Sequence, residues 1–168
     1  MKVKFKVLLI IMVISTKIVA QNNVCNCCTS EYKLFDFWLG DWLVYNKKGV
    51  KVGSNKVLSM QDSCLIQENW KSTGQTGTSY NYYNNADSTW NQVYIDNSGT
   101  VLELKGRFVN NTMTLKSKPI KSTKSNFYYY NRITWKKINE NEVSQVWDIV
   151  TEKDSIINVV FDGIYKRK

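Results

Sequence analysis

The sequence predicts an all-β protein, an up-and-down antiparallel β-barrel of about ten strands with one short helical turn before the first strand. Short runs of alternating apolar and polar residues follow one another along the chain, and turn-forming residues separate them at intervals of roughly 8–14 residues. The connections are tight, so we expect strands that are neighbours in sequence to pair in space. Closing such strands into a barrel removes the exposed edges of the sheet.

Composition narrows the possible functions. The 168 residues correspond to one domain, and 6 Trp, 10 Tyr and 6 Phe argue against a disordered chain. The sequence contains no histidine. This absence excludes Ser-His and Cys-His catalysis, histidine-ligated haem and histidine-bearing zinc sites.

Residues 1–20 resemble a secretory signal peptide. Three lysines precede an apolar run over residues 7–14, and Ala20 stands before a polar stretch, where we expect cleavage. The run is too short to cross a bilayer, which needs about 20 apolar residues. The sequence therefore predicts a secreted or periplasmic protein with no membrane span after processing. The alternatives are a retained membrane anchor and a lipid-anchored Cys25, although residues 22–24 lack the small residues expected before such a cysteine.

Without residues 1–20, the chain carries 19 basic and 14 acidic residues, a net charge of +5. The densest basic stretch consists of Lys116, Lys118, Lys121 and Lys124. It contains Pro119, serines and threonines, so we expect a solvated loop. No aromatic residues alternate with these lysines, and the sequence predicts no nucleic-acid partner.

The four cysteines lie beyond the predicted signal peptide. Cys25, Cys27 and Cys28 fall in a tail over residues 21–30, and Cys64 falls in a predicted strand. An even number of cysteines in an exported chain indicates disulfides, so we expect Cys64 to pair with one of the three tail cysteines. The alternative is a thiolate site for Cu(I) or zinc. We favour the disulfide and predict no bound metal.

The barrel domain is expected over residues 31–168. Residues 31–39 have the pattern of a short helical turn. The predicted strands cover residues 41–46, 50–59, 63–73, 76–84, 89–95, 100–108, 112–118, 127–137, 142–150 and 156–166.

Two strands have a uniformly apolar face, which predicts core walls. These faces consist of Leu102, Leu104 and Phe108 on one strand, and Ile157, Val159, Phe161 and Tyr165 on the other.

Other strands place large aromatic residues in the same phase as polar ones. Buried polar groups are unfavourable unless paired, whereas a ligand cavity combines aromatic walls with a few polar groups. We therefore predict a lumen lined by Glu68, Trp70, Tyr80, Tyr82, Trp90, Gln92, Tyr94, Gln145 and Trp147. Arg132 joins this set only if its strand is bulged or turned, because Ile133 and Trp135 occupy the opposite phase. The alternatives are that these faces point outward, or that their polar groups satisfy one another.

The chain contains the motifs FDFWLGDW at 35–42, CLIQENW at 64–70, GTSYNYY at 77–83, WNQVYID at 90–96, RITW at 132–135, QVW at 145–147 and FDGIYKR at 161–167. Together they resemble the motifs of a family of exported bacterial lipocalin-like proteins that is described as a domain of unknown function. The resemblance extends from about residue 31 to the C-terminus and implies a calycin-type barrel.

The wider calycin resemblance also implies roles for three structural residues. Gly40-Asp41-Trp42 is similar to the Gly-x-Trp that opens lipocalin barrels, so Gly40 would form a sharp bend and Trp42 would plug the closed end. Arg167, or Lys166 beside it, would pack over the Trp42 ring. The resemblance extends loosely to nitrobindin-type barrels, which hold haem through a histidine ligand. This chain has no histidine, so we expect no haem and predict no cofactor.

Three functions remain open from the sequence. The first is a binding protein for a small hydrophobic or amphipathic molecule. The second is a cofactorless enzyme in which Glu68 acts as a base and Arg132 or a tyrosine stabilises negative charge. The third is a structural or interaction protein with a filled barrel.

Overall fold

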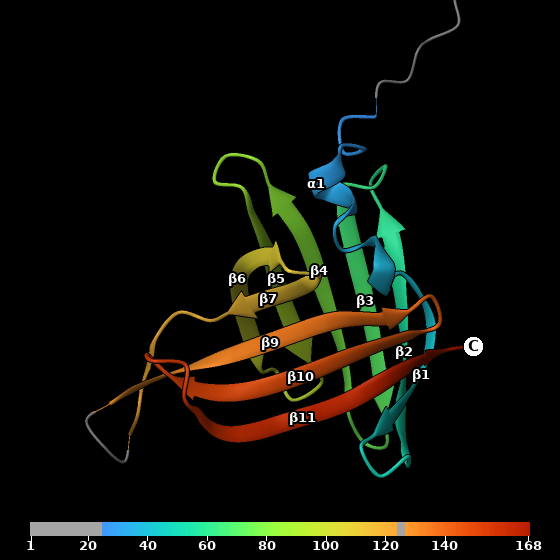
Figure 1. The fold of residues 1–168 in the computed structure, drawn as a ribbon. Helices are drawn as coiled ribbons and strands as arrows, with labels where there is room; N and C mark the ends of the chain where they lie inside the picture. Colours follow the sequence, from blue (N-terminus) through green and yellow to red (C-terminus); the bar gives the residue numbers. More distant parts are fainter. Residues whose placement is uncertain (1–24, 124–126) are drawn as a thin grey trace, which may run out of the picture.

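A computed structural model describes residues 25–123 and 127–168, which form a closed antiparallel β-barrel (Figure 1). Ten strands close the barrel, and the two-residue strand β8 (Ile120–Lys121) pairs only with β9. The predicted fold class is therefore confirmed. The predicted signal peptide, residues 1–20, and residues 21–24 of the predicted tail lie outside the described residues.

The observed elements follow the predicted order, and each predicted strand boundary lies within two residues of the observed one. The strands of the barrel are β1 (Gly40–Asn46), β2 (Lys51–Met60), β3 (Leu65–Ser72), β4 (Thr76–Asn84), β5 (Thr89–Asp96), β6 (Val101–Val109), β7 (Thr112–Lys116), β9 (Tyr128–Asn139), β10 (Glu142–Thr151) and β11 (Ile156–Arg167). The predicted helical turn is split into α1 (Ser30–Lys33) and a 3₁₀ turn, η1 (Asp36–Trp38). Strand β8 was not predicted and lies in the region expected to be a solvated loop.

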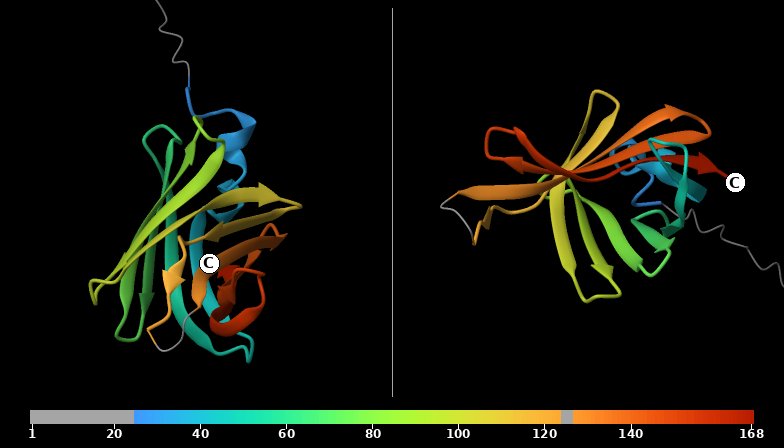
Figure 2. Two further views of the ribbon diagram at one scale, coloured as in Figure 1. Left: turned by 90° about the vertical axis from the view of Figure 1, so that its left-hand side faces the viewer. Right: turned by 90° about the horizontal axis from the view of Figure 1, so that it is seen from below.

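Consecutive strands pair around the barrel, except that β7 skips β8 and pairs with β9. The seam between β11 and β1 closes the barrel, with Trp42 opposite Arg167. Strands β9, β10 and β11 run across the wall formed by β1 to β5 (Figures 1 and 2). The two walls therefore enclose an interior between crossing layers of strands.

The helical segment seals one end of the barrel, which we call the closed end. Phe35 from this segment stacks on Trp38, with the ring centroids 4.9 Å apart, and makes edge contacts with Trp90 at 5.5 Å and Trp135 at 5.2 Å. These four side chains and Trp42 are buried in one core cluster. Offset and edge-to-face contacts of this kind stabilise aromatic clusters beyond the burial of their area. The closed end is therefore filled with side chains.

Trp42 and Arg167 fasten the seam at the closed end. The Arg167 Cζ lies 4.3 Å from the centre of the Trp42 ring, and Arg167 Nη1 donates to the Leu39 carbonyl at 3.1 Å. Trp42 Nε1 donates to the Trp38 carbonyl at 2.9 Å. Gly40 has φ of +140°, and a Cβ there would lie 2.2 Å from Arg167 Nη1, so only glycine fits this bend.

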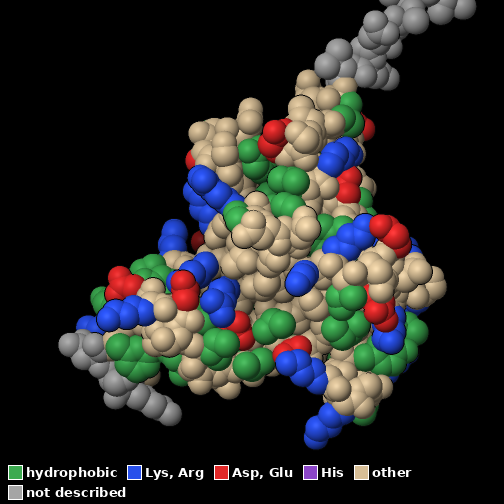
Figure 3. Space-filling view, viewed as in Figure 1, with side chains coloured by type: hydrophobic (Ala, Val, Ile, Leu, Met, Phe, Trp, Pro, Cys, Tyr) green, Lys and Arg blue, Asp and Glu red, His purple; other side chains and the backbone are tan. Residues whose placement is uncertain are grey.

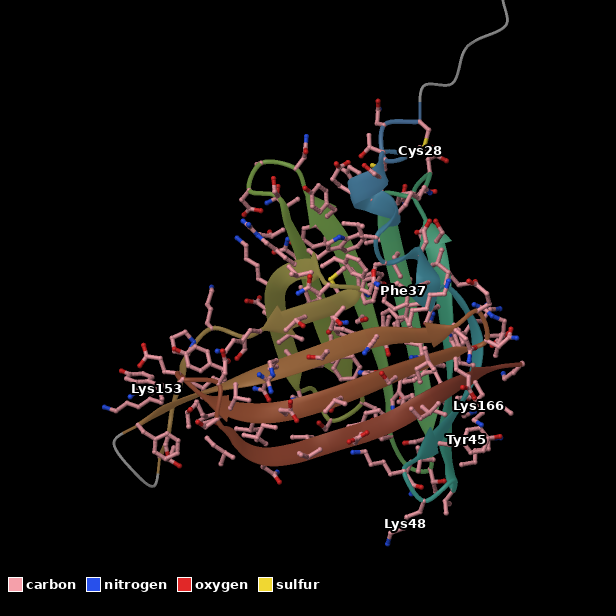
Figure 4. The ribbon with its side chains drawn as sticks, viewed as in Figure 1. Cys28, Phe37, Tyr45, Lys48, Lys153 and Lys166 are labelled. Atoms are coloured by element: carbon pink, nitrogen blue, oxygen red, sulfur yellow. A yellow bond between two sulfur atoms is a disulfide. The ribbon has the colours of Figure 1, made fainter. Side chains whose placement is uncertain are left out.

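One disulfide ties the N-terminal tail to the closed end, and a second lies within the tail. Cys27 is bonded to Cys64, so the expected link between Cys64 and the tail is present, and Cys25 is bonded to Cys28 (Figure 4). The sequence predicts Cys64 within a strand, and this is wrong: Cys64 lies in the turn before β3. All four cysteines are oxidised, which leaves no thiolate for the alternative metal site. Disulfides are typical of proteins that fold in an oxidising compartment.

One of the two predicted core faces is partly wrong. Ile157 and Val159 on β11 are each 47% exposed, whereas Phe161 and Tyr165 face the interior. The pairing of β10 with β11 shifts register between Trp147 and Asp148 and again between Ile149 and Val150. A bulge changes the face to which the following side chains point, so strict alternation fails along this strand.

Charged groups are interspersed on the surface. Lys116 of the predicted basic stretch pairs with Asp154 at 2.8 Å and lies over the Tyr130 ring. Basic and acidic side chains alternate across the face shown in Figure 3. Within residues 25–123 and 127–168, no helix is long and apolar enough to cross a membrane.

We expect Trp42→Ala to lower the free energy of unfolding by about 3–5 kcal/mol, because it removes a fully buried aromatic side chain and leaves a cavity. Denaturant unfolding followed by circular dichroism measures this change. A loss below about 1 kcal/mol, the size of a surface effect, would contradict the role of Trp42 as the plug of the closed end.

The two disulfides provide a matched pair of tests. Their sequence separations are 37 residues for Cys27–Cys64 and 3 for Cys25–Cys28. If each acts mainly by restricting the unfolded chain, replacing both cysteines of the longer loop with serine lowers the free energy of unfolding by about 4 kcal/mol, and the same change in the shorter loop by about 2 kcal/mol. Equal losses in the two double variants would show that loop closure is not the dominant effect.

Candidate functional site

An interior cavity of about 250 Å³ lies away from the closed end and is partly open to solvent. Its residues come from strands on both walls of the barrel and from the turn between β3 and β4. They are Glu68, Trp70, Gln75, Gln92, Tyr94, Leu102, Ile133, Gln145, Trp147, Val160, Phe161 and Tyr165. In Figure 4, Cys28 marks the closed end and Lys48 marks the β1–β2 turn at the other end of the molecule. We call the end that holds the cavity the open end.

The cavity brings together six of the ten residues predicted to line the lumen, namely Glu68, Trp70, Gln92, Tyr94, Gln145 and Trp147. Sequence reasoning assigned Leu102, Phe161 and Tyr165 to core walls and did not select Gln75, Ile133 or Val160. The phase of Ile133 offered a usable signal, since it matches that of Trp135, which is fully buried. The position of Val160 depends on the bulge in β11 and left no signal in the sequence.

The predicted inward orientation of Tyr80 and Tyr82 is wrong. Their side chains are 43% and 41% exposed, and they lie on the outer surface of β4. The opposite phase of this strand is inside, where Ser79 and Asn81 are buried. Small polar residues occupy these inward positions because they hydrogen bond to other polar groups in the interior.

Trp90 and Arg132 also lie outside the cavity. Trp90 is inward-facing but packs in the closed end against Phe35 and Tyr83. The Arg132 guanidinium forms an ion pair with Asp148 at 2.8 Å and does not join Glu68 in the cavity lining. Strand β9 is not turned at this point, and Ile133 takes the inward position instead.

Glycines on neighbouring strands make room for the aromatic walls of the cavity. A Cβ on Gly53 would lie 2.5 Å from the Trp70 ring, and a Cβ on Gly77 would lie 2.1 Å from the Tyr94 hydroxyl. The Trp70 ring makes an edge contact with Phe161, with the ring centroids 6.1 Å apart. Across the barrel, Trp147 Nε1 donates to Asn131 Oδ1 at 2.9 Å, which holds its indole ring in place.

A buried hydrogen-bond network crosses four strands beneath these rings. Glu68 accepts from Asn55 Nδ2 at 2.7 Å and from the Ser79 hydroxyl at 2.7 Å. Ser79 Oγ in turn accepts from Asn81 Nδ2 at 2.9 Å and from Gln92 Nε2 at 3.3 Å. Gln92 Nε2 also donates to Asn81 Oδ1 at 2.7 Å. Asn55 and Ser79 therefore donate directly to the Glu68 carboxylate, and the Ser79 hydroxyl links Asn81 and Gln92 to it.

Burial is the largest influence on the pKa of three groups that line the cavity, Glu68, Tyr94 and Tyr165. Desolvation raises the pKa of Glu68 above its ordinary value, and the hydrogen bonds from Ser79 and Asn55 offset part of this rise. Desolvation, followed by the charges of Glu68 and Asp96, raises the pKa of Tyr94 to about 12. Burial also raises the pKa of Tyr165, whose hydroxyl donates to Gln145 Oε1. Both tyrosines are therefore neutral at physiological pH.

The arrangement of the cavity is suited to bind a ligand that has an apolar part and a polar part. Trp70, Trp147 and Phe161 offer apolar surface, while Glu68 and the three glutamine side chains offer hydrogen-bonding atoms. Of the partners expected for Glu68 in a cofactorless enzyme, Arg132 is held by Asp148 and lies outside the cavity, whereas Tyr94 and Tyr165 line the cavity with Glu68. A barrel filled along its whole length is also not what the structure shows, because the open end contains a cavity.

Fold and site together define a closed antiparallel β-barrel with one filled end and a polar-aromatic cavity at the other. Comparison with models of known protein families gives no match for this chain. A search of curated proteins likewise gives no match.

The raised pKa of Glu68 predicts a pH-dependent stability difference from Glu68→Gln. A folded-state pKa above the unfolded value of about 4.5 means that the folded protein binds the proton more tightly, so the contribution of Glu68 to stability falls as pH rises above 4.5. The free energy of unfolding of the unaltered protein, minus that of Glu68→Gln, should therefore decrease across this range.

Urea unfolding at several pH values measures this difference, and using the variant as reference cancels the titration of the surface carboxylates. Glu103→Gln is the matched control, because Glu103 lies exposed on the outer face of β6. A difference for Glu68→Gln that is constant with pH, or that increases, would show that burial does not control this carboxyl.

Proposed function

We propose that this protein is an exported lipocalin-like binding protein that takes a small amphipathic molecule into the open end of its barrel. The observation that carries the proposal is the cavity itself, which combines aromatic walls with a buried polar network. Ligand sites in barrels lie at their mouths and have this composition, mostly apolar with a few placed polar groups. The sequence motifs that resemble the lipocalin-like family support the same assignment.

The two ends of the barrel differ in a way that favours a binding function over a purely structural one. A purely structural barrel gains most stability from a continuous apolar core, as the closed end shows with its packed rings. At the open end, Asn55, Glu68 and Gln92 occupy interior positions instead. Polar groups buried beside an unfilled space are unfavourable for folding alone, and a ligand that contacts them provides a reason for their presence.

Export to an oxidising compartment is the cellular setting of this proposal. The two disulfides support it, because such bonds persist outside the cytosol. The charge and apolar pattern of residues 1–20 supports a cleaved signal peptide as the route. We propose secretion or periplasmic location on these two grounds.

Binding of a neutral aromatic probe, 1-naphthylmethanol, tests the proposed function. We expect saturable binding with a stoichiometry near one, followed by the change in intrinsic tryptophan fluorescence, because Trp70 and Trp147 line the cavity. Leu102→Trp should weaken this binding at least about tenfold, since a larger side chain in a small cavity introduces steric costs of ~1–3 kcal/mol.

Val101→Trp is the matched control for this experiment. Val101 precedes Leu102 on β6 but is 58% exposed on the outside of the barrel. The control should bind the probe as the unaltered protein does. If the two tryptophan variants bind equally well, or if the unaltered protein shows no saturable binding, the cavity is not a ligand site.

A further inference from the structure

Glu68 is the only carboxylate that lines the cavity, and no lysine or arginine of the described chain lines it with Glu68. The ion pairs found in residues 25–123 and 127–168 all involve other acidic residues. A buried carboxylate without a counter-charge is unfavourable, and a buried charge is normally paired. The free protein thus presents an uncompensated acid at the wall of its cavity.

The hydrogen bonds around Glu68 favour its ionised form. The Ser79 hydroxyl accepts from Asn81 and Gln92, so its single proton is directed to Glu68 Oε2, while Asn55 Nδ2 donates to Oε1. Both oxygens therefore act as acceptors. An ionised carboxylate has about four lone-pair positions, so roughly half of this capacity remains for a donor that enters from the cavity.

Aromatic side chains from four strands line the same space. Trp70 comes from β3, Tyr94 from β5, Trp147 from β10 and Phe161, which lies beside Trp70, from β11. The face of an aromatic ring carries negative charge density and attracts an organic cation, most strongly for tryptophan. The carboxylate and the rings therefore favour the same sign of charge in a ligand.

We infer that the ligand is a small organic cation, a protonated amine on a compact apolar body, whose ammonium group binds Glu68 while its apolar part lies among Trp70, Trp147 and Phe161. This inference rests on the proposed function and specifies the chemistry of its ligand. The ammonium supplies the counter-charge that Glu68 lacks and donates to the free lone pairs of the carboxylate. The cavity of about 250 Å³ lies just below the ~300–1,000 Å³ usual for drug-sized ligands, which limits the body to one or two small rings.

Three probes of similar shape and different charge test the inference on the full mature chain. They are 1-naphthylmethylammonium, 1-naphthylmethanol and 1-naphthoate, compared by calorimetric titration at neutral pH. We expect the cation to bind at least about tenfold more tightly than the alcohol, because hydrogen bonds to charged groups are stronger than neutral ones. The anion should bind more weakly than the alcohol, since Glu68 repels it.

Glu68→Gln separates this inference from the proposed function. The variant keeps the size and polarity of the side chain but removes its charge, so it should lose the preference for the cation and still bind the alcohol. Glu103→Gln removes one negative charge from the outer face of β6 and should keep the preference. Equal binding of cation and alcohol by the unaltered protein, or a preference retained by Glu68→Gln, would overturn the inference and leave the proposed function standing. If none of the three probes binds, both fail.

A pH series on the unaltered protein decides the matter if Glu68→Gln does not fold. The groups facing Glu68 are Asn55 from β2, Ser79 from β4, Gln92 and Tyr94 from β5, and Tyr165 from β11. Of these only the tyrosines titrate, and both have a raised pKa, about 12 for Tyr94. Acidification should therefore reduce the affinity for the cation relative to the alcohol as Glu68 takes up a proton. A ratio of affinities that does not change with pH would overturn the inference.

Discussion

A barrel of ten strands encloses more interior than the side chains of its own strands fill, because the diameter of a barrel grows with its strand number. At the closed end, an element from outside the sheet fills this space: Phe35 and Trp38 of the helical segment enter the barrel and pack on Trp90 and Trp135. The Cys27–Cys64 disulfide ties the start of that segment to the barrel wall. The seam contact between Trp42 and Arg167 joins the first and last strands over the same plug. Closure and filling therefore depend on one aromatic cluster.

The open end has no such plug, and its residues are arranged differently. Gly53 and Gly77 allow Trp70 and Tyr94 to lie close to the barrel wall, so the rings line the space without filling it. The polar network from Gln92 to Glu68 replaces apolar packing with hydrogen bonds that end on one carboxylate. Removing the Glu68 carboxylate from water works against folding, as the raised pKa of Glu68 indicates. Groups with a strongly shifted pKa are more common in functional sites than elsewhere. The raised pKa of Glu68 therefore links the energetics of the open end to the proposed binding role.

The sequence predicts the fold because turn residues and alternation mark each strand. For β4, the predicted bounds are those of the structure, Thr76–Asn84. The sequence predicts the site only in part, because alternation defines the two faces of a strand but not which of them points into the barrel. On β4, the aromatic Tyr80 and Tyr82 suggested the inner face, yet Ser79 and Asn81 are inside because Glu68 and Gln92 on adjacent strands hydrogen bond to them. Bulges in β11 moved Val160 to the cavity and exposed Ile157 for reasons that lie in strand pairing. Such partners belong to other strands, and a single strand's pattern does not contain them.

The proposed function requires that a ligand enters one end of the barrel and leaves the other end unchanged, and the six tryptophans report on both ends. Trp70 and Trp147 line the cavity, whereas Trp38, Trp42, Trp90 and Trp135 lie in the closed-end core. The most direct measurement is a titration of ¹⁵N-labelled protein with 1-naphthylmethanol, observed at the indole N–H resonances and assigned with single Trp→Phe variants. Saturable shifts of the Trp70 and Trp147 signals, with the other four nearly unchanged, are the result that this account predicts. Larger shifts among the four closed-end signals, or equal shifts of all six, would contradict it.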